Sequence, residues 1–314
     1  MKLVIQIPCK DEAGQLPATL AVLPRQLDGI DHLQWLVVDD GSKDDTAAVA
    51  TSHGVDHLAR IPQNRGLARA FALGLETSCR LGADVIVNLD ADNQYDAAAI
   101  PALIAPILAG DADIVVGCRP IASIVHFSPI KKWLQRIGSA VVRVISGVDV
   151  SDATSGYRAY SREAAMRLNV YSRYTYTLET LIQAGQTGLQ VMEVPVGVNP
   201  PTRVSRLIKS VPRYVWRSML TILRTFLTYR PLEFFLVPAA LCFAGSATIG
   251  GFFLSHYLRG DGSGHVQSLI LAAILSILGA ASVAIGLLAN QLAVNRRLLE
   301  DLQFTQRRKE WRPP

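Results

Sequence analysis

The first 120 residues alternate between short apolar runs and longer stretches in which apolar residues recur at helical spacing. The apolar runs predict strands at residues 3–7, 34–38, 57–60, 84–89 and 113–117. The stretches between them predict a helix that carries Leu16, Leu20 and Leu23, a helix from residues 44–46 to about 53, and a helix from 67 to about 81. Alternation of strand and helix is typical of a doubly wound, mostly parallel α/β sheet. In such sheets, ligands bind beyond the carboxyl ends of the strands.

The C-terminal third is apolar over two long stretches, residues 232–258 and 269–292. Apart from Glu233, neither contains Lys, Arg, Asp or Glu, and each exceeds the roughly 20 residues that a helix needs to span a bilayer. A helical hairpin buried in a soluble core is the alternative, which the lack of a polar face disfavours. Basic residues flank the two stretches, at Arg206, Lys209, Arg213, Arg217, Arg224 and Arg230 and at Arg296, Arg297, Arg307, Arg308, Lys309 and Arg312. Because positive charge marks the cytoplasmic side, we expect a multi-pass protein of the cytoplasmic (inner) membrane, with the N-terminal part and the tail in the cytoplasm.

Residues 211–229 repeat apolar side chains at helical spacing, with Arg213, Arg217 and Arg224 between them. This pattern predicts an amphipathic helix in the membrane interface, with basic residues facing the lipid headgroups. A surface helix packed on a soluble domain is the open alternative. The sequence therefore predicts four parts: a cytoplasmic α/β domain at 1–205, an interfacial helical region at 206–230, a transmembrane hairpin at 231–292 and a basic cytoplasmic tail at 293–314.

The composition agrees with a membrane protein. Half of the residues are hydrophobic, and the mean hydropathy of +0.25 is high for a soluble protein. The net charge of +5 and the isoelectric point near 9.1 favour membrane lipids as a partner and no nucleic acid, because the basic residues flank the apolar stretches and no nucleic-acid-binding motif is present. The four cysteines show no Cys-x-x-Cys spacing and predict no disulfide framework, as in a reducing compartment. The first residues are typical of a strand rather than of a signal peptide.

The strongest chemical signal is an Asp-x-Asp pair at the end of the expected strand at residues 84–89. Side chains alternate along a strand, so Asp90 and Asp92 point the same way and two like charges lie close together. Mg²⁺ and Mn²⁺ prefer one or two carboxylates together with phosphate oxygens, so a divalent ion that carries a diphosphate fits this pair. Solvated loop or helix-cap carboxylates are the alternative. Asp39 and Asp40 follow another expected strand at the same edge of the sheet, which favours the metal site.

Two other uses of this architecture are excluded by missing glycines. A dehydrogenase requires Gly-x-Gly-x-x-Gly after the first strand, where this chain has Pro8-Cys9-Lys10-Asp11-Glu12. The Gly-x-x-x-x-Gly-Lys-Ser loop of nucleoside triphosphatases is also absent from the sequence.

Five short motifs then follow one another along the chain. They are Ile7-Pro8-Cys9-Lys10-Asp11-Glu12, Val38-Asp39-Asp40-Gly41-Ser42 with Asp45-Thr46, Asn64-Arg65-Gly66, Asp90-Ala91-Asp92-Asn93-Gln94 and Ser155-Gly156-Tyr157-Arg158. In this order they resemble family 2 glycosyltransferases of the GT-A fold, over about residues 1–230. The subgroup that the chain is most similar to is the polyprenyl-phosphate glycosyltransferases, which include dolichyl-phosphate mannose synthases and GtrB- and ArnC-type enzymes. The two C-terminal apolar stretches match the GtrB and ArnC arrangement.

The resemblance implies roles for individual residues. The implied nucleotide-binding residues are Pro8, Lys10, Glu12, Asp39, Asp40, Asn64, Gly66, Asp90 and Ala91. The divalent cofactor, Mg²⁺ or Mn²⁺, is expected on Asp90, Asp92 and Gln94. The implied catalytic residues are Asp92, Arg119 and Asp152. Arg119 is directed at a phosphate, whereas for Asp152 a base, a sugar-hydroxyl ligand and a helix cap all stay open.

A lipid phosphate needs cations of its own. The residues expected to bind it are Arg119, Arg203, Ser205, Arg206 and Lys209, the last four of which directly precede the amphipathic helix. Two positions depart from the family pattern: Lys10 adds a cation beside the nucleotide, and residues 175–180 replace a more common Phe-x-Phe-(Asp/Glu) sequence. We expect both positions to affect donor selectivity.

The sequence thus predicts a membrane-bound, metal-dependent, inverting glycosyltransferase. We expect it to move a single sugar from a nucleotide sugar, with a UDP-sugar the expected donor, to polyprenyl phosphate of the undecaprenyl type. The alternatives are a processive polysaccharide synthase, although Gln-x-x-Arg-Trp and further membrane helices are missing, and a non-catalytic nucleotide-binding membrane scaffold. Small residues in the apolar stretches, among them Gly245, Gly250 and Gly279, permit close helix packing and favour a homo-oligomer.

Overall fold

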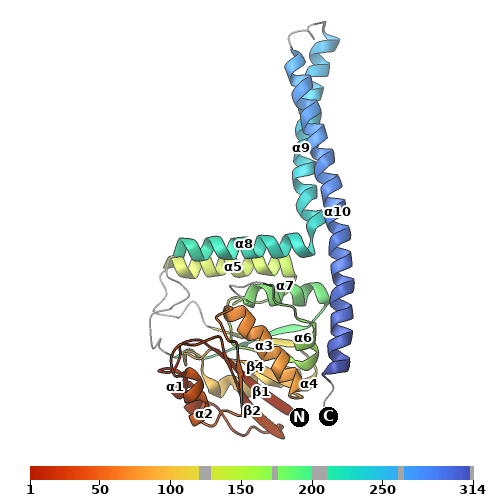
Figure 1. Cartoon of the computed structure of the whole chain (residues 1–314). Coiled ribbons are helices and arrows are strands. Elements are labelled where there is room, and N and C mark those ends of the chain that lie inside the picture. The colour runs from red at the N-terminus through yellow and green to blue at the C-terminus, as the bar shows by residue number, and fades with distance from the viewer. Residues whose placement is uncertain (120–128, 172–175, 200–210, 261–264, 312–314) are drawn as a thin grey trace. The chain divides into compact units, whose positions relative to one another are not determined.

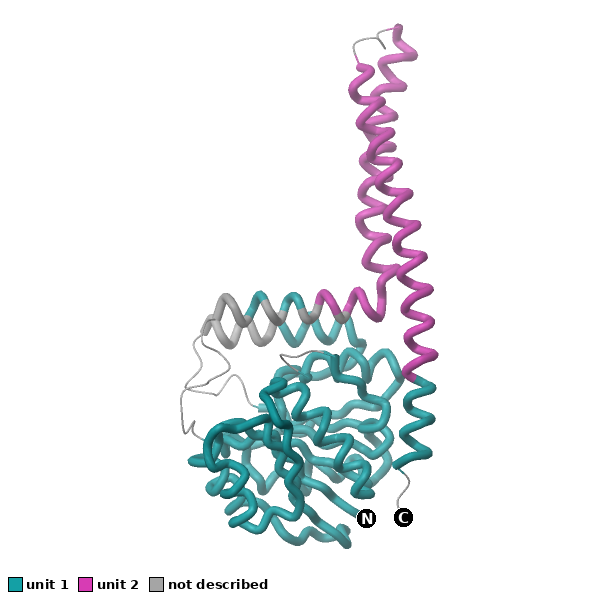
Figure 2. Tube along the Cα trace, in the orientation of Figure 1, with its two compact units in different colours: residues 1–222, 301–314 teal, residues 223–300 magenta. Residues whose placement is uncertain are grey.

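The structure is a computed structural model that describes residues 1–119, 129–171, 176–199, 211–260 and 265–311. Within these ranges, the side chains of residues 129–137, 211–214, 217–218, 221–222 and 225 are not described. The chain divides into two compact units (Figure 2). The first comprises residues 1–222 and 301–314, and the second comprises residues 223–300.

A seven-stranded sheet forms the centre of the first unit (Figure 1). Its strands are β1 (Lys2–Cys9), β2 (His32–Asp39), β3 (His57–Arg60), β4 (Val85–Asn88), β5 (Ile114–Cys118), β6 (Arg158–Ser161) and β7 (Val191–Pro195). They lie in the order β3-β2-β1-β4-β6-β5-β7. Strand β6 runs antiparallel to β4 and β5, and every other pair is parallel. The predicted doubly wound, mostly parallel α/β sheet is confirmed.

Helices complete the first unit. They are α1 (Leu16–Val22), α2 (Thr46–Ser52), α3 (Leu67–Arg80), α4 (Ile100–Ala109), which follows the single turn η1 (Ala97–Ala99), α5 (Pro129–Ser146), α6 (Arg162–Arg167) and α7 (Thr177–Thr187). Helix α8 (Val211–Tyr229) begins in this unit and ends in the second. Helices α1, α2, α3 and α8 correspond to the helices that the hydrophobic spacing predicts. Helices α4, α5, α6 and α7 and strands β6 and β7 were not predicted.

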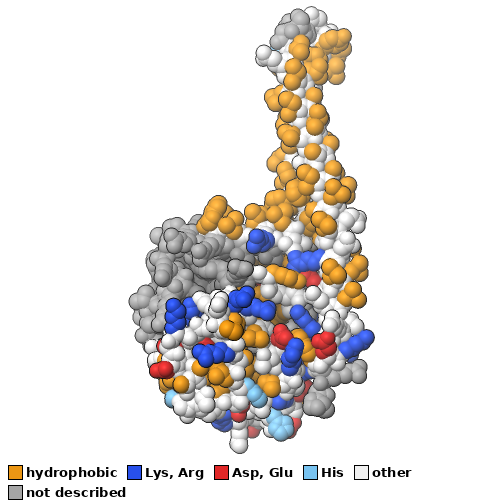
Figure 3. Space-filling view, viewed as in Figure 1, with side chains coloured by type: hydrophobic (Ala, Val, Ile, Leu, Met, Phe, Trp, Pro, Cys, Tyr) orange, Lys and Arg blue, Asp and Glu red, His pale blue; other side chains and the backbone are white. Residues whose placement is uncertain are grey.

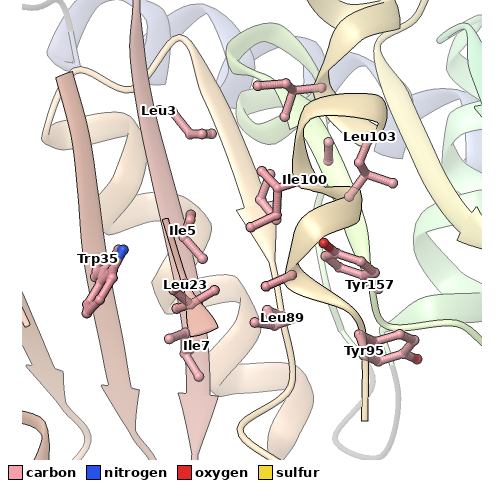
Figure 4. Packing of buried hydrophobic residues seen from close by; sticks show 14 of the residues in the cluster. Leu3, Ile5, Ile7, Leu23, Trp35, Leu89, Tyr95, Ile100, Leu103 and Tyr157 are labelled. Carbon is pink, nitrogen blue, oxygen red and sulfur yellow. The ribbon is translucent and has the colours of Figure 1, made fainter. Parts of the chain in front are cut away.

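The alternation of side chains along β1 sorts its residues onto two faces. Leu3, Ile5 and Ile7 are fully buried and belong to one core cluster with Leu16 of α1 and Ile100 of α4 (Figure 4). Burial of such side chains stabilises the fold by about 1.5–3 kcal/mol each. This cluster fixes the position of β1, from whose carboxyl end the candidate site begins.

The parallel register brings the ends of three strands together. Cys9 of β1 pairs with Asp39 of β2, and Gln6 of β1 pairs with Asn88 of β4. Since the residues that follow these strands leave the sheet at the same edge, the Asp39-Asp40 pair and the Asp90-x-Asp92 pair lie on one side of the first unit.

The second unit contains two long apolar helices, α9 (Pro231–Leu258) and the greater part of α10 (Val266–Glu310). Both are long and apolar enough to cross a membrane, and only 6% and 17% of their most apolar windows are buried. Apolar side chains cover their surface (Figure 3). The core helix of a soluble protein would be mostly buried, so this exposure disfavours the alternative of a hairpin inside a soluble core.

Small residues let α9 and α10 approach each other closely within the second unit. Ser246 Oγ donates to the carbonyl of Ala272 at 2.7 Å and lies 2.8 Å from Ser276 Oγ. A Cβ on Gly279 would lie 3.0 Å from the ring of Phe243. These contacts are made inside one hairpin, and assembly of several chains stays a prediction. Helix α10 continues without a break past residue 292, where the sequence predicts the hairpin to end.

Candidate active site

The predicted nucleotide-binding residues lie at the ends of β1 and β2. Pro8 is buried within β1, and Lys10 just beyond it is exposed. Asp39 is fully buried, accepts a hydrogen bond from the backbone N–H of Ser42 at 2.8 Å, and lies 3.1 Å from Nε of Arg60. The Asp39 carboxylate is therefore fixed in place at the edge of the sheet.

Asp40 holds the Asn64-Arg65-Gly66 motif through the backbone. Its two carboxylate oxygens accept from the N–H groups of Arg65 at 2.7 Å and Gly66 at 2.8 Å. Gly66 has φ of +95°, a conformation that glycine adopts at little cost. A Cβ on Gly41 would lie only 2.7 Å from the backbone nitrogen of Asn64, so this turn requires a glycine. Four predicted residues, Asp39, Asp40, Asn64 and Gly66, therefore lie in or at the edge of two adjoining loops. Asp40 has a structural role there, because its carboxylate holds the second loop.

Glu12 connects the first turn to α2. Its backbone N–H donates to Thr46 Oγ1 at 2.8 Å, and its carbonyl accepts from the N–H groups of Gln15 and Leu16 at the start of α1. The Glu12 side chain is buried, and its negative charge contributes to the electrostatic environment of Asp90.

Asp90 and Asp92 form the acidic centre of the site. Burial and the negative charge of Asp92 together raise the pKa of Asp90 to about 7, against the opposing effect of the Arg119 charge. Gln94 Nε2 donates to Asp92 Oδ2 at 2.8 Å, and its backbone N–H lies 3.3 Å from Oδ1. In this structure Gln94 therefore orients Asp92. Ala91, between Asp90 and Asp92 in the sequence, is buried, and its carbonyl accepts from Thr19 Oγ1 of α1 at 2.8 Å.

The chemistry of Asp90 and Asp92 shows whether a divalent ion fits between them. The Asp90 carboxylate has a raised pKa beside the charge of Asp92, and a nearby cation would stabilise both carboxylates in their charged form. Among the residues that the structure describes, no three His, Cys, Asp or Glu side chains gather as a ligand set. An ion held by Asp90 and Asp92 would take its remaining ligands from phosphate oxygens and water, which is the usual preference of Mg²⁺. The residues present fit such an ion.

A segment after β7 fixes the loop that follows the acidic centre. Asn199 Nδ2 donates to the carbonyl of Asn93 at 3.0 Å, and the N–H of Asn199 donates to the carbonyl of Gln94 at 2.8 Å. Asn93 itself has φ of +53°, which asparagine tolerates better than most residues. Asn199 was not predicted, because the contact joins positions about a hundred residues apart.

Arg119 and Asp152 form a buried bidentate ion pair. Arg119 Nε and Nη2 lie 2.6 and 3.0 Å from the two carboxylate oxygens of Asp152, and Nη2 also donates to Thr154 Oγ1 at 3.0 Å. Burial pushes the pKa of Asp152 upward, but the charge and hydrogen bonds of Arg119 and the hydroxyl of Thr154 outweigh this and leave it below its usual value. Asp152 is therefore an ionised counterion, and this structure gives it neither the geometry of a helix cap nor that of a free base.

A wall of residues whose mutual contacts the sequence did not indicate closes the site behind Asp90. Asn88 Nδ2 donates to Tyr176 Oη and to the carbonyl of Gly156, both at 2.8 Å. A Cβ on Gly156 would lie 2.8 Å from Tyr176 Oη and 3.0 Å from Asp90 Oδ2. The ring of Tyr176 stacks on Phe71 of α3 at 3.8 Å. Gly156, part of the recognised Ser155–Arg158 motif, was the available signal for this wall.

Arg158 of the same motif supports the wall from within. It is fully buried, and its guanidinium donates to the carbonyls of Ser155, Ala153 and Thr177 and to Thr180 Oγ1, each at 2.9 Å. It thereby ties the Asp152-containing turn to the start of α7. The other predicted residues, Arg203, Ser205, Arg206 and Lys209, lie outside the described residues.

The sheet order and the carboxylates at its edge define a GT-A type fold, which solved structures share. Glucosyl-3-phosphoglycerate synthase from Mycobacterium tuberculosis, solved with Mn²⁺, UDP-glucose and phosphoglyceric acid, matches with a TM-score of 0.57 at 22% sequence identity, covering 70% of this chain and 79% of that one. The chain belongs to glycosyl transferase family 2, which matches residues 4–168. It is accordingly a glycosyltransferase.

Two relatives show which members of the family the chain is similar to. Undecaprenyl-phosphate mannosyltransferase from Micrococcus luteus is 28% identical over 206 residues, which cover 62% of this chain and 83% of the relative. UDP-N-acetylglucosamine–dolichyl-phosphate N-acetylglucosaminyltransferase from Methanococcus voltae is 32% identical over 183 residues, which cover 51% of this chain and 72% of the relative.

Proposed function

We propose that this chain is a metal-dependent, inverting glycosyltransferase that moves one sugar from a nucleotide-diphosphate sugar to polyprenyl phosphate at the cytoplasmic face of the inner membrane. The observation that carries the proposal is the Asp90–Asp92 pair, at the carboxyl edge of a GT-A type sheet, in a chain with two helices long and apolar enough to cross a membrane. The relatives named for undecaprenyl phosphate and dolichyl phosphate support the lipid acceptor.

Asp90 and Asp92 would hold Mg²⁺ or Mn²⁺, which stabilises the charge of the departing nucleotide diphosphate. Gln94, by its hydrogen bond to Asp92, keeps that carboxylate turned in one direction. Asp39, Glu12 and the Asn64–Gly66 turn would surround the nucleoside. The Mn²⁺ in the complexes of glucosyl-3-phosphoglycerate synthase supports this assignment.

The reaction needs no side-chain base. A phosphate monoester is already ionised at neutral pH, and its oxygen can attack the anomeric carbon directly. Asp152 has its carboxylate on Arg119 and a lowered pKa, so it is suited to orienting Arg119 rather than to removing a proton. Catalysis then rests on positioning and on charge. Attack from the face opposite the leaving group inverts the anomeric centre.

We also propose a UDP-sugar as the donor. The support is the UDP-N-acetylglucosamine named for the Methanococcus voltae relative and the UDP-glucose bound to glucosyl-3-phosphoglycerate synthase. The sugars in the names of the similar proteins differ, and no sugar is proposed for this chain.

The lipid phosphate is proposed to bind at residues 203–209, directly before α8. In this scheme residues 1–205 form the catalytic domain, α8 lies in the membrane interface, residues 231–292 span the membrane and the tail returns to the cytoplasm.

The test is direct. The purified full-length chain is incubated with undecaprenyl phosphate, Mn²⁺ or Mg²⁺ and a panel of UDP- and GDP-sugars, and nucleotide release and lipid mass are measured. We expect one donor to give a singly glycosylated lipid, with release that requires both lipid and metal. Asp92→Asn should lower turnover by about a hundredfold or more, since it removes a group that helps to stabilise transition-state charge. The exposed Asp111 provides the control, and Asp111→Asn should keep wild-type turnover.

Two results would contradict the proposal. A ladder of lipid masses would indicate a processive synthase. Nucleotide binding without turnover of any donor, and without dependence on metal, would indicate a scaffold that kept the fold and lost the reaction.

A further inference from the structure

The last turns of α10 belong to the first unit and contact α6. This C-terminal tail, residues 301–311, carries Arg307, whose guanidinium donates to the carbonyls of Met166 at 2.8 Å and Leu168 at 3.2 Å and to Asn169 Oδ1 at 2.9 Å. The sequence alone predicts a basic tail in the cytoplasm next to the membrane. Arg307 instead has its donors on protein acceptors.

The acceptors of Arg307 are the kind that a cation satisfies best. Met166 and Leu168 are at the C-terminal end of α6, where carbonyls lack partners within the helix and the helix dipole is negative. Further contacts fix the tail at the same place: the guanidinium of Arg167 lies 4.2 Å from the ring centroid of Phe304, and Arg162 donates to the carbonyl of Trp311, which is 8% exposed.

The segment that Arg307 holds, residues 168–171, is tied to α7. Asn169 N–H donates to Gln183 Oε1 at 2.9 Å, and Gln183 Nε2 donates back to the Asn169 carbonyl. Tyr171 N–H donates to the carboxylate of Glu179 at 3.1 Å. A cavity of about 270 Å³ borders this segment and is also lined by Arg307 and Trp311.

Helix α7 in turn leads to the active site. Tyr176, the residue before its first turn, contributes the hydroxyl that meets Asn88 and Gly156 beside Asp90. The carbonyl of Thr177 and the hydroxyl of Thr180 hold Arg158. A chain of contacts therefore runs from Arg307 through Asn169 and α7 to the wall behind the carboxylates.

We propose that Arg307 is a positioning residue of the transferase, which sets the location of residues 168–171 and α7 and thereby of Tyr176 beside Asp90. The tail is then part of the catalytic unit rather than only a basic anchor for the membrane. The neighbouring Arg308 carries the same charge one position further along the helix but is exposed, so it is the matched control for Arg307. The catalytic part of this inference rests on the proposed transferase function, whereas the structural part does not.

The experiment compares Arg307→Ala with Arg308→Ala in the full-length chain reconstituted with anionic lipid. Both variants lose one positive charge from the tail, so their electrostatic attraction to the membrane falls equally. Hydrogen exchange of backbone amides in residues 168–182 is measured by mass spectrometry, together with kcat, KM for the nucleotide sugar and thermal unfolding. Arg307→Lys is the conservative variant, which keeps the charge but not the forked geometry that reaches three acceptors.

For Arg307→Ala we expect exchange in residues 168–182 to accelerate about tenfold and kcat to fall about tenfold, as for loss of hydrogen bonds to a charged group, with KM changed less than about twofold. Arg307→Lys should recover part of kcat, and Arg308→Ala should match the wild type in both readouts.

Equal behaviour of the two alanine variants would overturn the inference, as would faster exchange in Arg307→Ala with an unchanged kcat in an active enzyme. General unfolding of Arg307→Ala, seen as accelerated exchange over the whole sheet, would also overturn it unless Arg307→Lys, folded throughout, still shows the loss in kcat. Failure of the proposed function is recognised separately, by a wild-type chain that turns over no donor. In that case only the structural part of the inference is tested, by hydrogen exchange. Unchanged exchange in residues 168–182 of Arg307→Ala would show that the tail does not position α7.

Discussion

At the scale of single residues, Arg119 and Asp152 show how burial decides the state of a charge. Their side chains are 14% and 1% exposed, and the carboxylate engages two nitrogens of the guanidinium. Removal of either partner from such a pair leaves an uncompensated charge away from water, which is far more costly than loss of a surface ion pair. The pair therefore fixes the turn that carries Asp152 as well as the direction of Arg119.

The lowered pKa of Asp152 sets the pH range in which this pair stabilises the fold. Because its folded pKa lies below the unfolded value of about 4, the contribution is fully present above that pH and is lost as the pH falls through the folded pKa. We expect Asp152→Asn to lower the free energy of unfolding by about 3–5 kcal/mol at neutral pH and to approach the wild type under strongly acidic conditions.

Denaturant unfolding of the full-length chain in detergent, repeated from neutral to acidic pH, measures this difference. Asp149→Asn is the control, since Asp149 is 90% exposed and lies 3.0 Å from Arg143 at the surface. It should change little at any pH. A difference between wild type and Asp152→Asn that does not depend on pH would contradict the assigned ionisation.

The sequence predicted which residues gather at the site better than it predicted what they contact. Asp39, Asp40, Asp90 and Asp92 were found from their place after strands, and they lie at one edge of the sheet. That Asp40 accepts two backbone hydrogen bonds from Arg65 and Gly66 follows from a loop conformation that no local pattern encodes. The Tyr176 wall was missed for a related reason, because its partners come from distant parts of the chain.

At the scale of elements, strands β1, β2 and β4 were predicted from short apolar runs, which are typical of strands buried on both faces. Helices α1 and α3 were predicted from apolar residues at helical spacing. Helix α7 escaped because its polar residues are buried: Glu179, Thr180 and Gln183 all make internal contacts, so the helix has no polar outer stripe to recognise. Strand β6 escaped because it begins with Arg158, and only the fold supplies the oxygens that make a buried arginine tolerable.

The crossing of α5 and α7 depends on one glycine. A Cβ on Gly185 of α7 would lie 1.8 Å from the carbonyl oxygen of Ser146 in α5, so Gly185→Ala must push the two helices apart. Two turns before Ser146 on α5, Ser139 Oγ accepts from the N–H of Ala153, next to Asp152. We expect Gly185→Ala to destabilise the fold by about 1–3 kcal/mol, as overpacking does, and to lower turnover through displacement of the Asp152 turn.

Gly138, within α5, is the matched control, since no described atom lies within 4 Å of the position of its Cβ. Gly138→Ala should stabilise the chain by about 0.5–1 kcal/mol, because alanine favours the helix more than glycine does. Thermal unfolding of both variants gives the comparison. Equal shifts of the two melting temperatures would show that α5 and α7 do not approach each other this closely.

At the scale of the whole molecule, the tail constrains how many times the chain crosses the membrane. Met166 belongs to the first unit, and Arg307 at the far end of α10 donates to its carbonyl. Residues in contact lie on the same side of a membrane. A chain that leaves the first unit, passes through α9 and α10 and returns to it must therefore cross an even number of times if it crosses at all. The two candidate spans found among the described residues satisfy this condition.

Two crossings predict that the connection between α9 and α10 lies on the side of the membrane opposite to the first unit. In the proposed topology the first unit is cytoplasmic, as the basic residues outside the two spans favour, so His265, directly before α10, should face the opposite side of the membrane. In a Cys242→Ala background, whose remaining cysteines Cys9, Cys79 and Cys118 are buried, a membrane-impermeant maleimide added to intact spheroplasts should label His265→Cys but not Arg308→Cys. Inverted vesicles should give the reverse pattern. Labelling of both positions from one side would mean that α9 and α10 lie on the membrane or pack against another protein, and the proposed route of the chain through the bilayer would have to be abandoned.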